Sequence, residues 1–173
     1  MGKNNLILIG MPGAGKSTVG VVVAKLLGYG FVDTDIVIQE KTGRLLKDII
    51  ADEGIEKFVE IENDINANLE VNNSVISPGG SVIYGKEAME HYKEIGTVVY
   101  LNVSFNTINK RLSNLEGRGV VLKSGQTLKD LYEERRVLYE KYADIIIEEE
   151  PDRDLATTAK IVATEYIEKK GCF

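Results

Sequence analysis

Nine consecutive residues near the start of the chain carry the strongest chemical signal in the sequence. They are Gly10, Met11, Pro12, Gly13, Ala14, Gly15, Lys16, Ser17 and Thr18, and they fit the phosphate-loop pattern G-x-x-x-x-G-K-[ST] at every fixed position. Glycines let backbone N–H groups close around phosphate oxygens because no Cβ is in the way. Lys16 can reach the terminal phosphates of a nucleotide, and Ser17 can bind magnesium. All nine residues are therefore predicted to bind a nucleotide. A chance glycine-rich turn would not be expected to lie between a strand-like run and a helical one.

Two acidic residues, Asp33 and Asp35, end the short strand-like run 31–35. Alternate residues of an extended segment share one face, so both carboxylates are expected to point the same way. Near magnesium and a phosphate, one acid can bind metal-bound water while the other accepts a proton from a substrate hydroxyl. A pair of acids in a surface turn is the alternative, and the nearby phosphate loop favours the functional interpretation.

Four arginines are candidates for binding anions. Arg111 and Arg118 are assigned to the nucleotide side, because a guanidinium can stack on a base or neutralise a transferring phosphoryl group. Arg135 and Arg136 are assigned to an anionic substrate, which a guanidinium can bind with two parallel hydrogen bonds. A solvated arginine is the alternative in each case, and we expect it to apply to at least one of the last two.

These residues need a scaffold that brings them to one cleft. The strands are expected at 5–9, 31–35, 74–77, 97–103 and 143–147, and the helices at 19–27, 36–41, 45–51, 86–92 and 128–142, with others from 55, 104 and 155. This alternation predicts an α/β fold: one five-stranded parallel sheet with helices on both faces. Ligands bind at the carboxyl ends of such strands, where the phosphate loop, the two acids and the loop 78–80 would meet.

The segment 113–125 differs from the rest of the chain. It is polar, contains Gly117, Gly119 and Gly125, and has little periodicity. These features are typical of a mobile loop, and we expect a lid over the nucleotide here.

Composition limits the partners that are expected. The chain has 173 residues, of which 43% are hydrophobic and 28% charged, as is ordinary for a single soluble domain spanning 1–173. The net charge of −6 does not favour a nucleic-acid partner, and no apolar run is long enough for a membrane span. The single cysteine, Cys172, allows no disulfide within the chain, which is compatible with a cytoplasmic protein. The single histidine, His91, disfavours a histidine base or a histidine-rich metal site.

Taken together, the motifs resemble those of shikimate kinases, which have a nucleoside-monophosphate-kinase-like P-loop fold. The segments that match in order and spacing cover most of the chain: Gly10–Thr18, Phe31–Asp35, Gly54 followed by Phe58 and Glu62, Gly79-Gly80, Arg111 with Arg118, and 135–139 before Ala143-Asp144.

The resemblance implies an enzyme of aromatic amino-acid biosynthesis that uses ATP and Mg²⁺ to phosphorylate the 3-hydroxyl of shikimate, and we expect the protein to be a monomer. It makes Asp33 the magnesium-linked carboxylate beside Ser17, and Asp35 the group that binds shikimate hydroxyls. Arg111 would pack on adenine, and Arg118 would be the catalytic arginine of the lid, acting with Lys16 and Asp33. Arg135, or its neighbour Arg136, would hold the shikimate carboxylate beside Gly79, Gly80, Ser81 and Glu62.

The chain departs from the family pattern mainly on the acceptor side. Val59 stands where the family has an arginine that clamps the substrate carboxylate, although the acidic partner of that arginine remains as Glu62. Ser81 replaces the third glycine of a triple glycine, and Gly119 replaces the proline after the lid arginine. Two alternatives therefore stay open: a related kinase for another small hydroxyl compound, and a nucleotide-binding module without catalysis.

Overall fold

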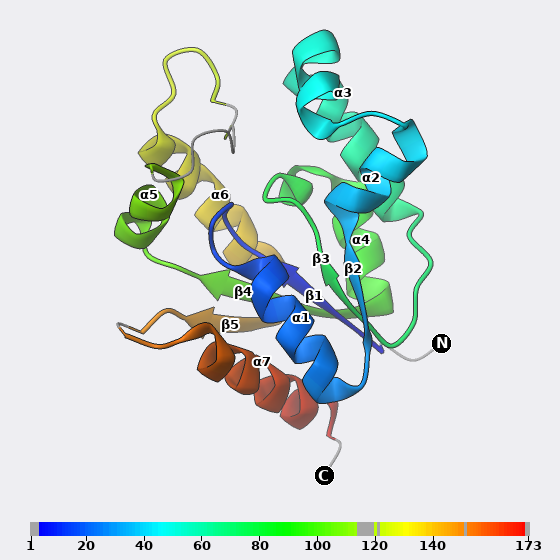
Figure 1. Cartoon of the computed structure of the whole chain (residues 1–173), viewed down its shortest axis with the longest axis vertical. Helices are drawn as coiled ribbons and strands as arrows, with labels where there is room; N and C mark the ends of the chain where they lie inside the picture. Colours follow the sequence, from blue (N-terminus) through cyan, green and yellow to red (C-terminus); the bar gives the residue numbers. More distant parts are fainter. Residues whose placement is uncertain (1–3, 114–119, 121, 151, 172–173) are drawn as a thin grey trace.

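Five parallel strands form one sheet at the centre of the molecule (Figure 1). The computed structural model of the chain describes residues 4–113, 120, 122–150 and 152–171. Within these residues the strands are β1 (Asn5–Ile9), β2 (Gly30–Asp33), β3 (Ser74–Ser77), β4 (Gly96–Asn102) and β5 (Ile145–Glu148). They lie in the order β2-β3-β1-β4-β5, and every neighbouring pair is parallel. The α/β fold with a five-stranded parallel sheet is therefore confirmed.

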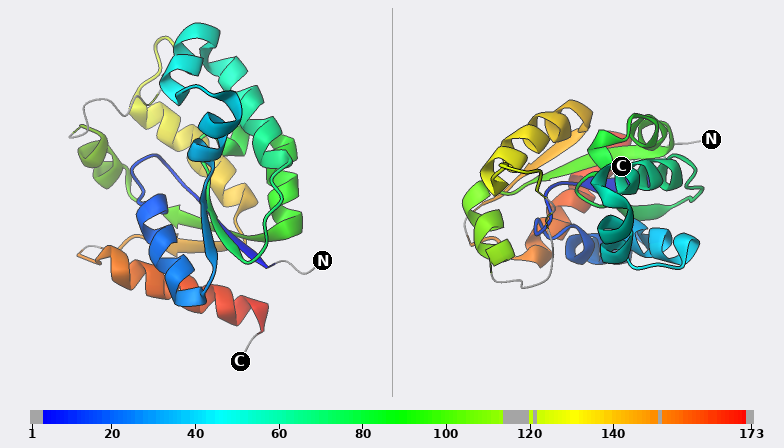
Figure 2. Two further views of the ribbon diagram at one scale, coloured as in Figure 1. Left: turned by 45° about the vertical axis from the view of Figure 1, so that its right-hand side comes forward. Right: turned by 90° about the horizontal axis from the view of Figure 1, so that it is seen from above.

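Helices cover both faces of this sheet. The helices are α1 (Lys16–Leu27), α2 (Thr34–Thr42), α3 (Leu46–Ala67), the short 3₁₀ helix η1 (Val82–Tyr84), α4 (Lys86–Ile95), α5 (Phe105–Ser113), α6 (Leu128–Tyr142) and α7 (Leu155–Lys170). Helices α1 and α7 pack together on one face, while α4 and α6 pack on the other (Figure 2). A parallel strand at the centre of such a stack is apolar on both sides, which explains the continuous buried run from Leu6 to Ile9 in β1.

Two predicted element boundaries are wrong for identifiable reasons. Strand β2 ends at Asp33, and Asp35 lies in the first turn of α2 instead of continuing the strand. The side chain of Asp33 caps α2 by accepting a hydrogen bond from the Asp35 N–H (3.0 Å), so the helix starts earlier than expected. Strand β4 begins at Gly96, one residue before the predicted start at 97, and the same glycine is the C-cap of α4.

The helices predicted at 45–51 and from 55 form one interrupted helix, α3. Gly54 interrupts it with φ 85° and ψ 170°, a conformation that favours glycine, and the chain resumes helical geometry after it. This bend leads into the half of α3 that carries Phe58 and Glu62 on its buried side.

The lid predicted at 113–125 falls largely on residues that the structure does not describe. Residues 114–119 and 121 are outside the described part, and Arg118 is among them. In the described part of the chain, no helix combines the length and the apolar character needed to cross a bilayer.

Asn5 ties the beginnings of three strands together. It is buried, and its side-chain amide donates hydrogen bonds to Val71 O (3.0 Å) and Ile95 O (3.1 Å). Its side-chain oxygen accepts from Ser74 N (3.0 Å). These bonds fix the chain entering β3 and β4 against β1.

We expect Asn5→Ala to lower the free energy of unfolding by about 2–4 kcal/mol, because each buried polar group left without a partner costs about 1–3 kcal/mol. Urea unfolding followed by circular dichroism measures this change. Asn68→Ala is the control, since Asn68 is exposed and bonds only within its own turn, to Asp64. Equal stability of the two variants would contradict the role given to Asn5.

Candidate active site

The phosphate loop joins the end of β1 to the start of α1. Gly13 and Gly15 have φ of 82° and 89°, values that a residue with a Cβ adopts only with strain. Gly15 is also the N-cap of α1 and supplies no side chain, so the first N–H groups of the helix have no side-chain cap. Such an N-terminus attracts anions through its unpaired donors and its partial positive charge. The loop therefore has the backbone conformation that a phosphate site needs.

Lys16 is held inside this loop. Its Nζ donates hydrogen bonds to Gly10 O (2.8 Å) and Met11 O (3.0 Å), and the side chain is buried. Burial lowers the pKa of Lys16 to about 8, with the negative charge of Asp35 acting against this effect. The ammonium group therefore keeps its charge at neutral pH, and it lies where nucleotide phosphates would need it.

Three side-chain oxygens gather at the ends of β2, β3 and the loop. Ser17 Oγ lies 3.2 Å from Asp33 Oδ2 and 3.3 Å from Ser77 Oγ. The parallel register pairs Asp33 with Ser77, which brings both side chains to the same edge of the sheet. Magnesium binds oxygen ligands and usually keeps several waters, so this group fits a magnesium ion that is shared with phosphates. Ser77 was missed in the sequence, where it is only the last residue of a strand.

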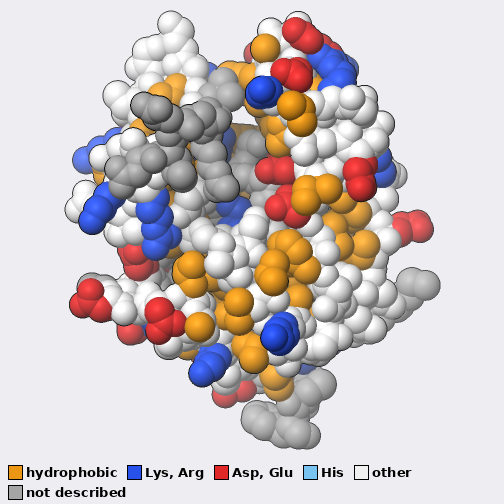
Figure 3. All heavy atoms as spheres, viewed as in Figure 1, with side chains coloured by type: hydrophobic (Ala, Val, Ile, Leu, Met, Phe, Trp, Pro, Cys, Tyr) orange, Lys and Arg blue, Asp and Glu red, His pale blue; other side chains and the backbone are white. Residues whose placement is uncertain are grey.

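Two carboxylates converge on Gly79. A Cβ added at this glycine would lie 2.7 Å from Glu62 Oε1 and 3.1 Å from Asp35 Oδ1. Asp35 comes from α2 and Glu62 from α3, so two helices supply one carboxylate each to the space beside Gly79. A hollow is visible between the side of the molecule with α5 and the side with α2 and α3, and acidic side chains line it next to α2 (Figure 3).

Glu62 is the most deeply buried acid of this group, with 1% of its surface exposed. Its Oε2 accepts a hydrogen bond from Ser81 Oγ (2.5 Å), while Oε1 is buried without a hydrogen-bond partner among the described residues. Burial raises the pKa of the Glu62 carboxyl to about 7, and the bond from Ser81 opposes this rise. The unpaired oxygen is therefore available to a donor on a ligand.

Arg135 lies on the buried side of α6, next to the phosphate loop. A Cβ at Gly80 would lie 3.0 Å from Arg135 Nη1 and 2.7 Å from Pro12 Cδ. The guanidinium stacks over the ring of Tyr84, with 5.5 Å between Cζ and the ring centroid, and its Nε has no hydrogen-bond partner within the described part of the chain. An anion bound here can accept a hydrogen bond from this Nε.

Arg136, also predicted to bind substrate, points away from this group. It is exposed and forms ion pairs with Glu133 (3.3 Å) and Glu140 (3.8 Å) on its own helix. Successive residues of a helix are about 100° apart, so two adjacent arginines cannot face the same pocket. The expectation that one of the two is a solvated charge agrees with this geometry.

Arg111 lies on the other side of the phosphate loop. Its Nη1 donates a hydrogen bond to Gly13 O (2.8 Å). It also lines a pocket with residues from the phosphate loop, β4, β5, α7 and the turn before α7, among them Ala14, Leu101, Ile147, Arg153 and Leu155. The lining also includes Glu148, Glu149 and Glu150, and Arg153 forms an ion pair with Glu150. The apolar groups and the Arg111 guanidinium beside the loop can contact the face of a flat aromatic base. The sequence indicated Arg111 but not the other walls of the pocket.

This arrangement belongs to the P-loop kinases, in which one pocket binds a nucleotide and a second pocket binds the compound that receives the phosphoryl group. The family profile of shikimate kinase matches residues 12–169 of the chain. The shikimate kinase of Sulfurihydrogenibium sp. is 38% identical over 159 residues, which cover 91% of this chain and 93% of that protein. The shikimate kinase of Persephonella marina is 37% identical over 147 residues, covering 84% of this chain and 89% of that protein.

The structure of shikimate kinase from Acinetobacter baumannii in complex with shikimate gives a TM-score of 0.84 at 31% identity, covering 96% of this chain and 94% of that one. The chain therefore belongs to the shikimate kinase family and is an ATP-dependent small-molecule kinase. The resemblance inferred from motif spacing is confirmed. A nucleotide-binding module without catalysis is not supported.

We expect Lys16→Met to reduce phosphoryl transfer by about 10²–10³-fold, because it removes one preorganised charge from a closed site. The substitution keeps the length of the side chain, so the protein should remain folded. A coupled assay of ADP release, with circular dichroism as the check on folding, measures the effect. Near-normal turnover by the folded variant would show that the loop is not the phosphate site.

Proposed function

We propose that this protein transfers the γ-phosphoryl group of ATP to the 3-hydroxyl of shikimate. One observation carries the proposal: Arg135, Asp35 and Glu62 converge on Gly79 and Gly80, directly against Pro12 of the phosphate loop. An arginine facing two carboxylates suits a small compound that has one carboxylate and several hydroxyls. The compound would lie within reach of the nucleotide phosphates, as in-line transfer requires.

On the acceptor side, Arg135 binds the carboxylate of shikimate with its guanidinium, whose Nε has no hydrogen-bond partner among the described residues. Asp35 accepts from the ring hydroxyl to be phosphorylated and so draws its proton away from the attacking oxygen. Its position in the first turn of α2 fixes the direction of the carboxylate. Gly79 has no side chain, which leaves room for a ligand beside the carboxylates of Asp35 and Glu62. A Cβ at this position would lie against both carboxylates.

On the nucleotide side, residues 10–18 hold the phosphates of ATP and Arg111 covers the base. Ser17 and Asp33, with Ser77 beside them, hold Mg²⁺, which neutralises charge on the phosphate oxygens. The described residues contain no cluster of three or more His, Cys, Asp or Glu side chains that could hold a metal. This agrees with an ion that shares its coordination with the nucleotide and water.

Further assignments remain predictions from the sequence and the family. They are the lid at 113–125 with Arg118 as its catalytic arginine, a single domain, a monomeric state, a cytoplasmic location and the absence of nucleic-acid or membrane partners.

A second acceptor is also considered, because one side of the pocket departs from the family pattern. Val59 is half-buried and packs against a small apolar cluster that includes Ile38, Ile49 and Phe58. Glu62 consequently has no arginine partner on α3, and a carboxylate substrate has one guanidinium anchor instead of two. A related small compound, with a hydroxyl or cationic group facing Glu62, would suit the same site.

We expect Val59→Arg to lower the Michaelis constant for shikimate about tenfold or more if shikimate is the acceptor. Residues 59 and 62 are three apart on one helix, so the new guanidinium can pair with Glu62 and add a second anchor. If the acceptor is another compound, the variant should lose activity on that compound and gain activity on shikimate. Steady-state assays on shikimate and on a panel of small polyols, amino alcohols and hydroxy acids measure both outcomes.

Val137→Arg is the matched control, because Val137 is 62% exposed on α6 and receives the same substitution outside the pocket. Its Michaelis constants should equal those of the wild type. Tight binding of shikimate by the wild type, unchanged by Val59→Arg, would show that residue 59 does not face the acceptor.

A further inference from the structure

Glu62 has lost its arginine neighbour on α3, yet one of its oxygens is firmly held. Ser81 Oγ donates to Glu62 Oε2 at 2.5 Å, and this is the one hydrogen bond to the Glu62 carboxylate among the described residues. Of the two departures on the acceptor side, Ser81 thus contacts the carboxylate of Glu62, and Val59 lies one helical turn before Glu62 on α3.

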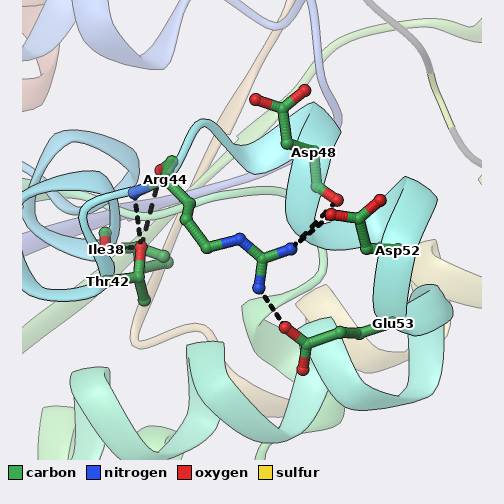
Figure 4. Close-up of polar contacts among 6 residues, drawn as sticks. All are labelled: Ile38, Thr42, Arg44, Asp48, Asp52 and Glu53. Carbon is green, nitrogen blue, oxygen red and sulfur yellow. Dashed lines mark hydrogen bonds and ion pairs between the residues drawn. The ribbon is translucent and has the colours of Figure 1, made fainter.

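Other cations do not take the place of the arginine. Arg44 is the only arginine between residues 34 and 67, and it is bound elsewhere (Figure 4). Its guanidinium donates to Asp52 Oδ2 (2.8 Å), to Glu53 and to the backbone oxygen of Asp48. Within the described residues no lysine, arginine or histidine forms an ion pair with Glu62.

The backbone around Ser81 is well suited to aim a side chain. Val82 N donates to Gly79 O (3.2 Å) and Tyr84 N donates to Ser81 O (3.0 Å), which closes the turn into η1. Tyr139 of α6 donates to Gly80 O (2.6 Å) and fixes the same turn from the opposite side. A hydroxyl on this turn has little freedom, so its hydrogen bond also restricts the carboxylate that accepts it.

We propose that Ser81 is a positioning residue that replaces the missing arginine. It holds Glu62 Oε2 so that Oε1 faces the space beside Gly79 and accepts a hydrogen bond from a hydroxyl of the acceptor. The proposal rests on the proposed function for the identity of that acceptor. It changes the role of Ser81 from a substrate contact, as the sequence suggested, to a group that acts through Glu62.

The charge state of Glu62 gives an independent signal of this contact. A hydroxyl that donates to a carboxylate favours the ionised form, so the bond from Ser81 limits the rise that burial causes in the pKa of Glu62, which stands at about 7. Removing the hydroxyl should raise the pKa further and leave less carboxylate at neutral pH. The other charged or titratable groups facing Glu62 from neighbouring elements stay the same in the experiment: Lys16, Asp35, Tyr92, Arg135 and Tyr139.

The test is Ser81→Ala in two backgrounds, the wild type and Val59→Arg. In the wild type we expect the Michaelis constant for shikimate to rise about tenfold, as for one charge-assisted hydrogen bond, with kcat and the Michaelis constant for ATP changed less than about twofold. In the Val59→Arg background, Ser81→Ala should change the Michaelis constant for shikimate less than about twofold, because the introduced guanidinium then holds Glu62. Ser81→Thr keeps a hydroxyl and should keep the wild-type value within about threefold.

Ser74→Ala is the control, since Ser74 lies at the end of β3 away from the site and, among the described residues, its hydroxyl donates to Asn72 O (3.0 Å). It should leave the Michaelis constants unchanged. A tenfold rise in both backgrounds would show that Ser81 contacts the acceptor directly, and no rise in either would show that it has no part in binding. Both results overturn the proposal.

A second measurement does not depend on the acceptor. The pKa of Glu62 can be followed by NMR of ¹³C-labelled side-chain carboxyls in the free protein, with Glu62→Gln identifying the signal. We expect Ser81→Ala to raise this pKa and Ser81→Thr to leave it near the wild-type value. If the wild type does not phosphorylate shikimate, the proposed function fails while this titration still decides whether Ser81 controls Glu62. An unchanged titration in Ser81→Ala overturns the proposal.

Discussion

Two segments approach each other so closely in the site that a side chain would not fit between them. A Cβ on Gly80 would lie 2.7 Å from Pro12 Cδ, with Arg135 Nη1 only 3.0 Å from the same point. The parallel pairing of β1 with β3 creates this approach, because it brings the ends of both strands to one edge of the sheet. A guanidinium for the acceptor and a loop for the nucleotide therefore share a wall. Phosphoryl transfer needs this proximity, since the enzyme contributes mainly positioning and electrostatic stabilisation.

The central strands were predictable from the sequence because they are buried on both faces. The run 5–9 has no alternation of polar and apolar residues, as is typical of a parallel strand covered on both faces. Element ends were less predictable, because they depend on side chains that bond to the backbone. The side chain of Asp33 accepts a hydrogen bond from Asp35 N and so starts α2. The alternating acids in the sequence did not indicate this helix cap. The break between the helices predicted at 45–51 and from 55 was predictable, and Gly54 interrupts the helical geometry of α3 there.

The site residues that belong to one continuous sequence motif were predictable. Lys16, Ser17 and their loop follow from one pattern, and the structure places them as that pattern requires. The contacts between distant segments were not predictable, because they depend on register and helix phase. Adjacent arginines at 135 and 136 look equivalent in the sequence, but only the first lies on the buried side of α6. The bond between Ser81 and Glu62 joins residues 19 positions apart and needs the turn before η1 to exist.

Glu62 shows that the requirements of binding and of stability conflict in this site. Its pKa rises from the ordinary 4.5 to about 7, chiefly through burial. Because the pKa of Glu62 is higher in the folded state than in the unfolded state, the folded protein binds more protons than the unfolded protein between about pH 4.5 and 7. Glu62 therefore favours the folded state at low pH, and this contribution to stability is lost as the pH rises through that window. Near neutral pH the fold therefore tolerates a partly ionised carboxylate whose Oε1 has no donor among the described residues. Burying such a charge without a partner costs several kcal/mol. A hydroxyl donor on a bound ligand therefore explains the position of this oxygen better than packing within the protein does. Asp35 Oδ1 faces the same space beside Gly79, and two carboxylates there match a ligand with more than one hydroxyl.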